Sequence, residues 1–195
     1  MRNWGATPEE RGRAYPADAL LPNTSERLTR AVSVSAPPAT LYRWLCQMQV
    51  APYSYDLVDN FGRRSPSELT PGAEHLSVGQ TLMVVFRLTD VQPGWMFTGL
   101  TRPWWGRLFG QVAVTYAAEP VDGTHARLVS RMVFASESRL GRVRAVALTW
   151  GDLVMLRRQL LNLKGHAERD AAQGPAASAS PPARPQSRRA RRRLR

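Results

Sequence analysis

The chain has 195 residues, of which 43% are hydrophobic, and it carries a formal net charge of +12. This length predicts one domain with tails, and about 150 folded residues can bury roughly two-thirds of the surface that the unfolded chain exposes. The composition therefore excludes a wholly disordered chain. Cys46 is the only cysteine, which excludes an intrachain disulfide, and no His or Cys lies at metal-ligand spacing from it.

The first residues do not have the pattern of a secretory signal, because residues 1–25 lack an apolar core. The most apolar stretch, residues 145–156, contains Asp152 and is too short for a transmembrane helix, which needs about 20 residues. We therefore expect a cytoplasmic protein without a transmembrane segment.

The first element with a clear period is a strand over residues 28–35, in which Val32 and Val34 alternate with serines. It follows an extended, proline-containing lead-in over residues 1–26. The Pro-Pro pair at 37–38 ends the strand, because proline lacks the N–H that a ladder needs and pre-sets the first turn of a helix.

A helix is expected over residues 38–48, because its apolar side chains recur at helical spacing. A second, short helical segment is expected over residues 53–60. Residues 62–79, rich in Ser, Pro and Gly, are expected to form a loop.

The second half of the chain predicts strands and then a helix. Strands are expected over residues 80–88, 95–102, 108–117 and 126–135. Turns at Gln92-Pro93-Gly94 and at Asp122-Gly123 join them in pairs. A long helix is expected over residues 140–167. A run of strands followed by a helix favours an α+β fold with an antiparallel sheet, and a curved sheet that grips the last helix leaves room for an apolar pocket.

Four stretches resemble a known family. They are residues 30–48, the segment Tyr53-Ser-Tyr-Asp-Leu-Val-Asp-Asn60, the lead-in 4–10 with 18–22, and residues 153–168. In order and spacing they resemble the START-related, birch-pollen-allergen-like (SRPBCC) ligand-binding superfamily, in particular its bacterial polyketide cyclase/dehydrase-like branch. One departure is the short segment Gln49-Val50-Ala51-Pro52, where that branch tends to have a glycine-rich segment; if this loop shapes the pocket entrance, the entrance differs here.

The resemblance implies a helix-grip fold, in which a curved antiparallel sheet wraps around a long C-terminal helix and two short helices follow the first strand. It implies a helix-grip ligand-binding domain over residues 27–168, after the lead-in over 1–26 and before a tail over 169–195. It also implies a hydrophobic cavity between the sheet and the last helix, but no single reaction, because fold does not fix function.

The candidate ligand-binding residues are aromatic and methionine side chains of the short helical segment, the strands and the last helix: Tyr53, Tyr55, Met83, Trp95, Phe97, Met132 and Trp150. The two tyrosines, with Asp56, would orient a carbonyl or hydroxyl group of a ligand, or equally pack at a helix end with their hydroxyls in water. The remaining side chains would together line a pocket for irregular ligands, while for any single one of them a filled core is the favoured interpretation.

Two arginines, Arg87 and Arg131, lie within predicted strands. On the concave face of the sheet either would bind a ligand carboxylate, and on the solvent face neither has a role. Alternation does not decide between the faces, because both faces of residues 80–88 are largely apolar.

No metal site or cofactor is expected from the sequence. None of the three histidines has a partner at metal spacing. The chain also lacks a glycine-rich phosphate loop before a helix and a Gly-x-Ser-x-Gly elbow. A serine or cysteine hydrolase therefore has no support.

The tail carries much of the positive charge. Residues 171–195 contain no acid and seven arginines, so that residues 1–170 keep a net charge of +5. The Pro, Ala, Ser and Arg composition predicts a disordered segment. Seven arginines on single-stranded nucleic acid would give a log–log salt slope of about −5, and they would also suit anionic lipid. The favoured interpretation is a solvated terminus, since no aromatic side chain stands among its arginines to stack bases.

These observations favour a non-catalytic binder of a small hydrophobic molecule, aromatic or lipid-like, in a cavity under the last helix. One alternative is a polyketide cyclase/dehydrase-type enzyme, in which pocket tyrosines or an arginine would polarise a carbonyl. Such an enzyme needs a polar pair inside the pocket. A second alternative is an interaction protein that acts through its basic tail.

Overall fold

The computed structural model describes residues 3–21, 23–54, 64–135 and 139–174, without the side chains of Ser25, Phe109 and residues 139–154. In this part of the chain six strands form one antiparallel sheet in the order β1-β6-β5-β4-β3-β2. Their bounds are β1 Thr24–Val34, β2 Thr81–Leu82, β3 Phe86–Gln92, β4 Met96–Thr101, β5 Val112–Pro120 and β6 Ala126–Ala135. The first strand of the chain thus pairs with the last.

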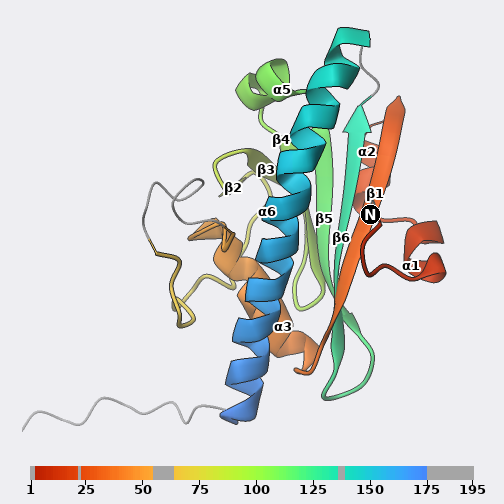
Figure 1. The fold of residues 1–195 in the computed structure, drawn as a ribbon. Helices are drawn as coiled ribbons and strands as arrows, with labels where there is room; N and C mark the ends of the chain where they lie inside the picture. The colour runs from red at the N-terminus through yellow and green to blue at the C-terminus, as the bar shows by residue number, and fades with distance from the viewer. Residues whose placement is uncertain (1–2, 22, 55–63, 136–138, 175–195) are drawn as a thin grey trace, which may run out of the picture.

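Helices cover both faces of this sheet (Figure 1). They are α1 Pro8–Gly12, α2 Pro16–Leu20, α3 Pro38–Cys46, the 3-10 helix η1 Gln47–Gln49, α5 Pro103–Phe109 and α6 Arg139–Ala172. The long C-terminal helix α6 runs across one face and packs against α3 and β1. This arrangement confirms the expected α+β, helix-grip fold.

The junction between β1 and α3 lies where the sequence predicted it. Pro37 is the N-cap of α3 in an extended conformation, and Pro38 is the first residue of the helix. The apolar face of α3 is fully buried, with Leu41, Trp44 and Leu45 all at 0% exposure. This helical face packs against the sheet and α6 and is part of the main core of the domain.

Alternation along the strands divides the sheet into two buried faces. The inner face, toward α3 and α6, contributes Leu28, Phe97 and Met132 to the main core, together with Leu160 and Leu163 of α6. The outer face forms two smaller clusters with the N-terminal segment; they are Tyr15, Ala31, Met96, Ala117 and Val129, and Ala17, Ala113 and Val133. Both faces of the sheet are therefore covered.

We expected an extended lead-in, but this segment forms the helices α1 and α2 on the outer face (Figure 1). Thr7 and Glu10 make a reciprocal capping box at the start of α1, in which the Thr7 N–H donates to Glu10 Oε2 at 2.8 Å. Helices of five residues are too short to show a 3.6-residue period in the sequence, and this explains the error.

Gly5 lets the lead-in lie directly on β1. Its φ is +69°, and a Cβ at this position would stand 2.1 Å from the carbonyl oxygen of Ala31. The Ala31 N–H donates to the Trp4 carbonyl at 3.1 Å. On the next segment, the Ala17 N–H donates to Thr115 Oγ1 at 3.1 Å, which holds α2 on β5.

Two predicted strands differ from those observed. The strand expected over 80–88 is interrupted at Met83 and Val84, whose φ angles of 47° and 62° are left-handed, so that β2 and β3 are separate. The strand expected over 108–117 begins only at Val112, because Pro103 starts the helix α5 before it. In contrast, the strand predicted over 126–135 has the bounds of β6.

The C-terminal helix does not end where the sequence predicted. The last helix is longer than the predicted 140–167 and continues to Ala172, past the expected start of the tail at 169. Residues 55–60 of the expected second helix, and the tail from residue 175 onward, lie outside the described residues. The described helices include none with the length and apolarity of a membrane span.

Candidate functional site

A buried arginine occupies the inner face of the sheet. Arg30 of β1 alternates with Leu28 and Val34, residues of the core under α6. The side chain of Arg30 is 1% exposed. A guanidinium group is always charged, and its burial among apolar side chains is costly unless anionic or polar groups surround it. Arg30 therefore marks this part of the interior as more than an apolar core.

Polar and aromatic side chains continue from Arg30 across the inner face. Ser130 of β6 lies opposite Arg30, and Tyr116 of β5 lies opposite Ser130. We call Arg30, Ser130 and Tyr116 the inner polar row. The row ends at Phe97 of β4, which is paired with Tyr116 and has its ring centroid 5.8 Å from that ring.

Ser130 has an unusual environment for a hydroxyl group. It is 0% exposed. Among the described residues, its Oγ has no hydrogen-bond partner. An unpaired buried hydroxyl costs about 1–3 kcal/mol. The inner polar row therefore includes a donor and acceptor that the described protein groups do not use.

Helix α6 approaches the inner polar row through Gln159. The Tyr116 hydroxyl donates to Gln159 Oε1 at 2.8 Å, and both groups are buried. Gln159 Nε2 donates to the Pro52 carbonyl at 2.5 Å and lies 3.2 Å from the sulfur of Met83. One side chain of α6 thus connects the sheet, the segment after η1 and the turn after β2.

Tyr53 belongs to an aromatic cluster between α3 and α6. Its ring makes edge contacts with Trp44 at 5.9 Å and with His166 at 5.5 Å between centroids. Its backbone is left-handed, with φ 56°, a costly conformation that its surroundings must maintain. Asn162 of α6 contributes by donating through Nδ2 to the Tyr53 carbonyl at 2.9 Å.

His166 closes this cluster on the side of α6. Its ring stacks on Trp44 at 4.4 Å between centroids. Burial, and then the positive charge of Arg169, lower the pKa of His166 below the ordinary value. The neutral imidazole accepts a hydrogen bond from Arg169 Nη2 through Nδ1 at 2.7 Å. The cluster is therefore an uncharged packing unit.

The structure gathers several of the predicted ligand-binding residues in one buried set. Tyr53, Phe97 and Met132 belong to the core under α6, and Met83 packs against it. Trp95 is not part of this core and is 43% exposed in the turn before β4. Tyr55 and the side chain of Trp150 lie outside the described residues. A role of these residues in binding stays a prediction.

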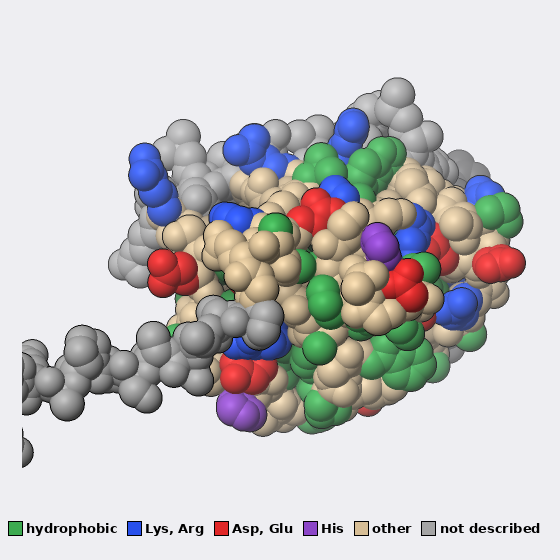
Figure 2. Space-filling model, turned by 90° about the horizontal axis from the view of Figure 1, so that it is seen from below, with side chains coloured by type: hydrophobic (Ala, Val, Ile, Leu, Met, Phe, Trp, Pro, Cys, Tyr) green, Lys and Arg blue, Asp and Glu red, His purple; other side chains and the backbone are tan. Residues whose placement is uncertain are grey.

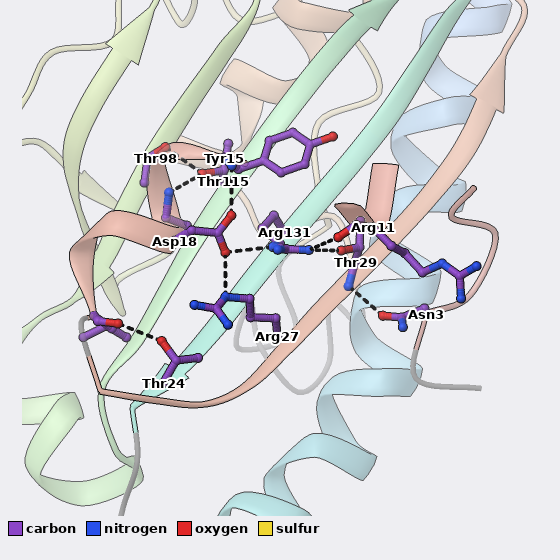
Figure 3. Close-up of polar contacts among 12 residues, drawn as sticks. Asn3, Arg11, Tyr15, Asp18, Thr24, Arg27, Thr29, Thr98, Thr115 and Arg131 are labelled. Atoms are coloured by element: carbon purple, nitrogen blue, oxygen red, sulfur yellow. Dashed lines mark hydrogen bonds and ion pairs between the residues drawn. The ribbon is translucent and has the colours of Figure 1, made fainter. Parts of the chain in front are cut away.

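The two arginines proposed from the sequence are on the outer face, as Figure 3 shows for Arg131. Arg131 is buried, and its Nε contacts Asp18 Oδ1 at 3.0 Å while Nη1 donates to Thr29 Oγ1 at 2.6 Å. Arg27 also contacts Asp18 Oδ1, at 3.2 Å. Arg87 lies on the same face, two strands beyond β5, and is exposed. Successive side chains of a strand point to opposite faces of the sheet. Arg87 is next to Leu88 and Arg131 is next to Met132, and both of these neighbours belong to the core toward α6, so neither arginine lies on that face.

Further ion pairs hold the N-terminal segment on the outer face. Arg127 binds both carboxylate oxygens of Glu10, at 2.7 and 2.8 Å, and Arg13 contacts Glu119 at 2.8 Å. Burial raises the pKa of Glu10, but the hydrogen bonds from Arg127 and Thr7 outweigh it and leave that pKa below its ordinary value. These contacts are internal and indicate a structural role for the outer face.

Sequence reasoning missed Arg30, Ser130, Tyr116 and Gln159. A signal for Arg30 was present, because it shares the parity of Val32 and Val34 in the first predicted strand. The contact of Tyr116 with Gln159 joins residues 43 positions apart, and no local pattern encodes it.

The described residues contain no group of three or more His, Cys, Asp or Glu side chains placed to hold a metal ion. Cys46 is fully buried, and burial raises the pKa of its thiol to about 12. Its thiolate is therefore disfavoured, which fits a packing residue and not a nucleophile.

The chain was compared with family models, curated proteins and solved structures. No family model and no curated protein matches the sequence. The solved structures that match include ZhuI aromatase/cyclase from Streptomyces sp. R1128, with 17% identity, 76% of this chain and 98% of that chain covered, and a TM-score of 0.47. The antiparallel sheet and the long C-terminal helix have the architecture that the sequence resemblance implied.

Two more structures show the range of such matches. A START superfamily protein from Mycobacterium smegmatis is 13% identical, with 73% of this chain and 97% of that chain covered and a TM-score of 0.44. Norcoclaurine synthase from Thalictrum flavum, in complex with dopamine and hydroxybenzaldehyde, is 11% identical, with coverages of 85% and 96% and a TM-score of 0.48.

Proposed function

We propose that this protein binds a small hydrophobic molecule with an anionic end between the inner face of the sheet and α6. The observation that carries the proposal is the buried pair on β1 and β6: a charged Arg30 lies opposite Ser130, whose hydroxyl has no partner among the described residues. A carboxylate on the ligand would accept hydrogen bonds from both groups. Charge-assisted hydrogen bonds of this kind also fix orientation.

The rest of the inner face suits the hydrophobic part of such a ligand. Phe97, Val114 and Met132 are buried there, and Met83 packs at the edge of the same core. Methionine side chains adapt to irregular shapes because they are unbranched and polarizable. Mainly apolar walls with a few convergent polar groups are typical of small-molecule sites. The ligand class that fits is an aromatic or lipid-like acid.

The test compares acids with their neutral analogues. The full chain is titrated with a fatty acid and an aromatic carboxylic acid, and with the methyl ester of each, by calorimetry and thermal shift. An acid at about a hundred times its dissociation constant should add roughly 2.7 kcal/mol to the free energy of unfolding. The esters should bind more weakly, because they lack the charge that Arg30 pairs with.

Two variants locate the polar end of the ligand. Arg30→Met should weaken acid binding by about 10- to 100-fold, the equivalent of about 1.5–3 kcal/mol, and should leave ester binding nearly unchanged. Ser130→Ala is a smaller change that keeps the fold and should weaken acid binding by up to about tenfold. Arg87→Met, an exposed arginine of the outer face, is the matched control. Equal binding of acids by wild type and by both inner-face variants would show that the proposal is wrong.

A cyclase/dehydrase-type enzyme is the second candidate, and the inner polar row favours it. Arg30 and the Tyr116–Gln159 pair are polar groups within the interior, which a simple carrier does not need. Arg30 would polarise a ligand carbonyl, and the walls would hold a flexible chain in a reactive shape. Incubation with a poly-β-ketone thioester, followed by mass spectrometry, separates the two candidates: an enzyme yields a cyclised or dehydrated product, whereas a binder returns the substrate.

The third candidate, an interaction protein that acts through its basic tail, concerns residues outside the described part of the chain. Removal of residues 175–195 would abolish binding to an acidic polymer in that case. The same deletion would leave acid-ligand binding by the domain unchanged.

A further inference from the structure

Three apolar side chains are exposed where α5 meets the turn between β2 and β3. They are Trp104 at 70%, Val84 at 57% and Leu108 at 48% exposure, and we call them the α5 patch. Single exposed apolar residues are ordinary on protein surfaces, but a group of large ones indicates an interaction site. None of the three belongs to a core cluster.

The turn that carries Val84 is bonded to the start of the helix that carries Trp104 and Leu108. Trp104 and Leu108 are four residues apart in α5 and therefore share one face of the helix. Arg102, the N-cap of α5, donates through Nη1 to the Val84 carbonyl at 3.0 Å, and its N–H donates to the Val85 carbonyl at 2.9 Å. The turn that carries Val84 is thus held against the start of α5.

The backbone of this turn is strained. Val84 has a φ of 62°, and Met83 before it has a φ of 47°. A β-branched residue rarely adopts this conformation, because its Cβ crowds the backbone. The Val84 side chain is exposed, so its burial does not offset the energetic cost of this backbone conformation.

Positive charge surrounds the patch. Residues 81–89 and 99–113 contain Arg87, Arg102 and Arg107 and no acidic residue. Helix α6 begins next to α5 (Figure 1), and its sequence contains three arginines before its first acid, Asp152. The opposite end of the molecule differs, because Figure 2 shows acidic and basic side chains interspersed on it.

We propose that the α5 patch docks on the surface of an anionic lipid membrane. Trp104, Leu108 and Val84 enter the boundary between headgroups and acyl chains, where a tryptophan ring is favoured. Arg102 and Arg107 bind lipid phosphates, each contributing about fivefold in affinity. This surface is separate from Arg30 and goes beyond the proposed ligand site, although it would bring that site to a source of amphipathic acids.

Charge decides between a membrane and a second copy of the chain. Self-association through the patch would bring the arginines of two copies together, which is unfavourable. An anionic lipid surface complements them. The apolar part of the patch is also small, as suits a shallow interfacial contact in which arginine stems lie along apolar surface.

The experiment uses the full chain and vesicles of phosphatidylcholine with phosphatidylglycerol, compared with phosphatidylcholine alone. We expect binding to the anionic vesicles, and the double variant Trp104→Ser/Leu108→Ser should weaken it by about tenfold or more. Arg107→Gln should weaken it by about fivefold, on the anionic vesicles alone. Val121→Ser is the control, because Val121 is 61% exposed at the other end of β5 and should bind as wild type.

A second measurement tests whether Trp104 of the folded protein enters the acyl-chain region of the bilayer. Brominated acyl chains should quench the fluorescence of Trp104, so that Trp104→Phe keeps binding but loses much of the quenching. Trp95→Phe, which removes a 43% exposed tryptophan before β4, should retain the quenching. Absence of binding to anionic vesicles would overturn the proposal, as would equal binding by the double variant, which would assign the interaction to the basic tail. A dimer that Trp104→Ser converts to monomer would also overturn it.

Discussion

The two faces of the sheet each bury an arginine, and the two arginines lie on the neighbouring strands β1 and β6. Arg131 faces outward and is opposite Thr29, while Arg30, one position further along β1, faces inward and is opposite Ser130. Arg131 has Asp18, Thr29 and the backbone of the N-terminal segment as partners. Next to Arg30, the hydroxyl of Ser130 has no partner among the described residues.

The comparison assigns one buried arginine to the fold and the other, by the proposal above, to the ligand site. On the outer face, the carboxylates of the N-terminal segment offset the desolvation of the arginines, and removal of one partner leaves a buried charge. On the inner face, the Ser130 hydroxyl lies opposite Arg30 and next to apolar residues of the core, the arrangement on which the proposed ligand site rests. We therefore interpret the outer arginines as part of the fold and Arg30 as part of the site.

The largest expected effect is a loss of stability, without a loss of ligand affinity, when the buried arginine of the outer face is replaced. Arg131→Met leaves Asp18 with Arg27, which is half exposed, as its remaining charge partner. We expect the free energy of unfolding to fall by about 3 kcal/mol, and the melting temperature by roughly 6–12 °C. Calorimetry measures both, while acid-ligand affinity of the folded protein should stay unchanged.

Arg87→Met is the control for this variant, because Arg87 is exposed on the same face; its stability should lie within about 0.5 kcal/mol of wild type. Reduced acid binding by folded Arg131→Met would break the distinction between the two faces.

A smaller effect is expected for the inner polar row. Tyr116→Phe removes the hydroxyl that donates to Gln159 Oε1 and leaves a buried acceptor unpaired. The free energy of unfolding should fall by about 1 kcal/mol, and acid-ligand affinity should fall as well. Urea unfolding of Tyr116→Phe, Gln159→Met and the double variant should give a coupling energy of about 1 kcal/mol. Additive single effects would mean that the hydrogen bond does not form in solution.

The smallest expected effect is a pH dependence of the outer face. The pKa of Glu10 is lowered in the folded protein from the ordinary value of 4.5, so folding favours the carboxylate. Its contribution to stability is complete above pH 4.5 and is lost as the pH falls through the folded pKa. Wild type should therefore lose more stability between about pH 5 and about pH 3 than Glu10→Gln does.

Glu9→Gln changes the exposed neighbouring carboxylate and serves as the control. Its urea unfolding should follow the wild-type pH profile. An identical profile for Glu10→Gln would show that the pair with Arg127 does not stabilise the fold.

Long elements with their own period could be predicted from the sequence. The Pro-Pro boundary of α3, the strand β6 and the terminal helix were predicted, because proline and hydrophobic alternation act locally. The short helices α1, α2 and α5 were not, since five to seven residues contain too little periodicity.

The site shows the same division. The sequence by itself determined the residue types that enter the core, such as Phe97 and Met132, because apolar side chains must leave water. It did not determine which face of the sheet packs against α6. Both faces are covered, the inner by α6 and the outer by α1 and α2, so neither side of a strand carries the polar pattern of a solvent face. Only the tertiary structure placed Arg131 against Asp18 and Arg30 on the face of the sheet toward α6.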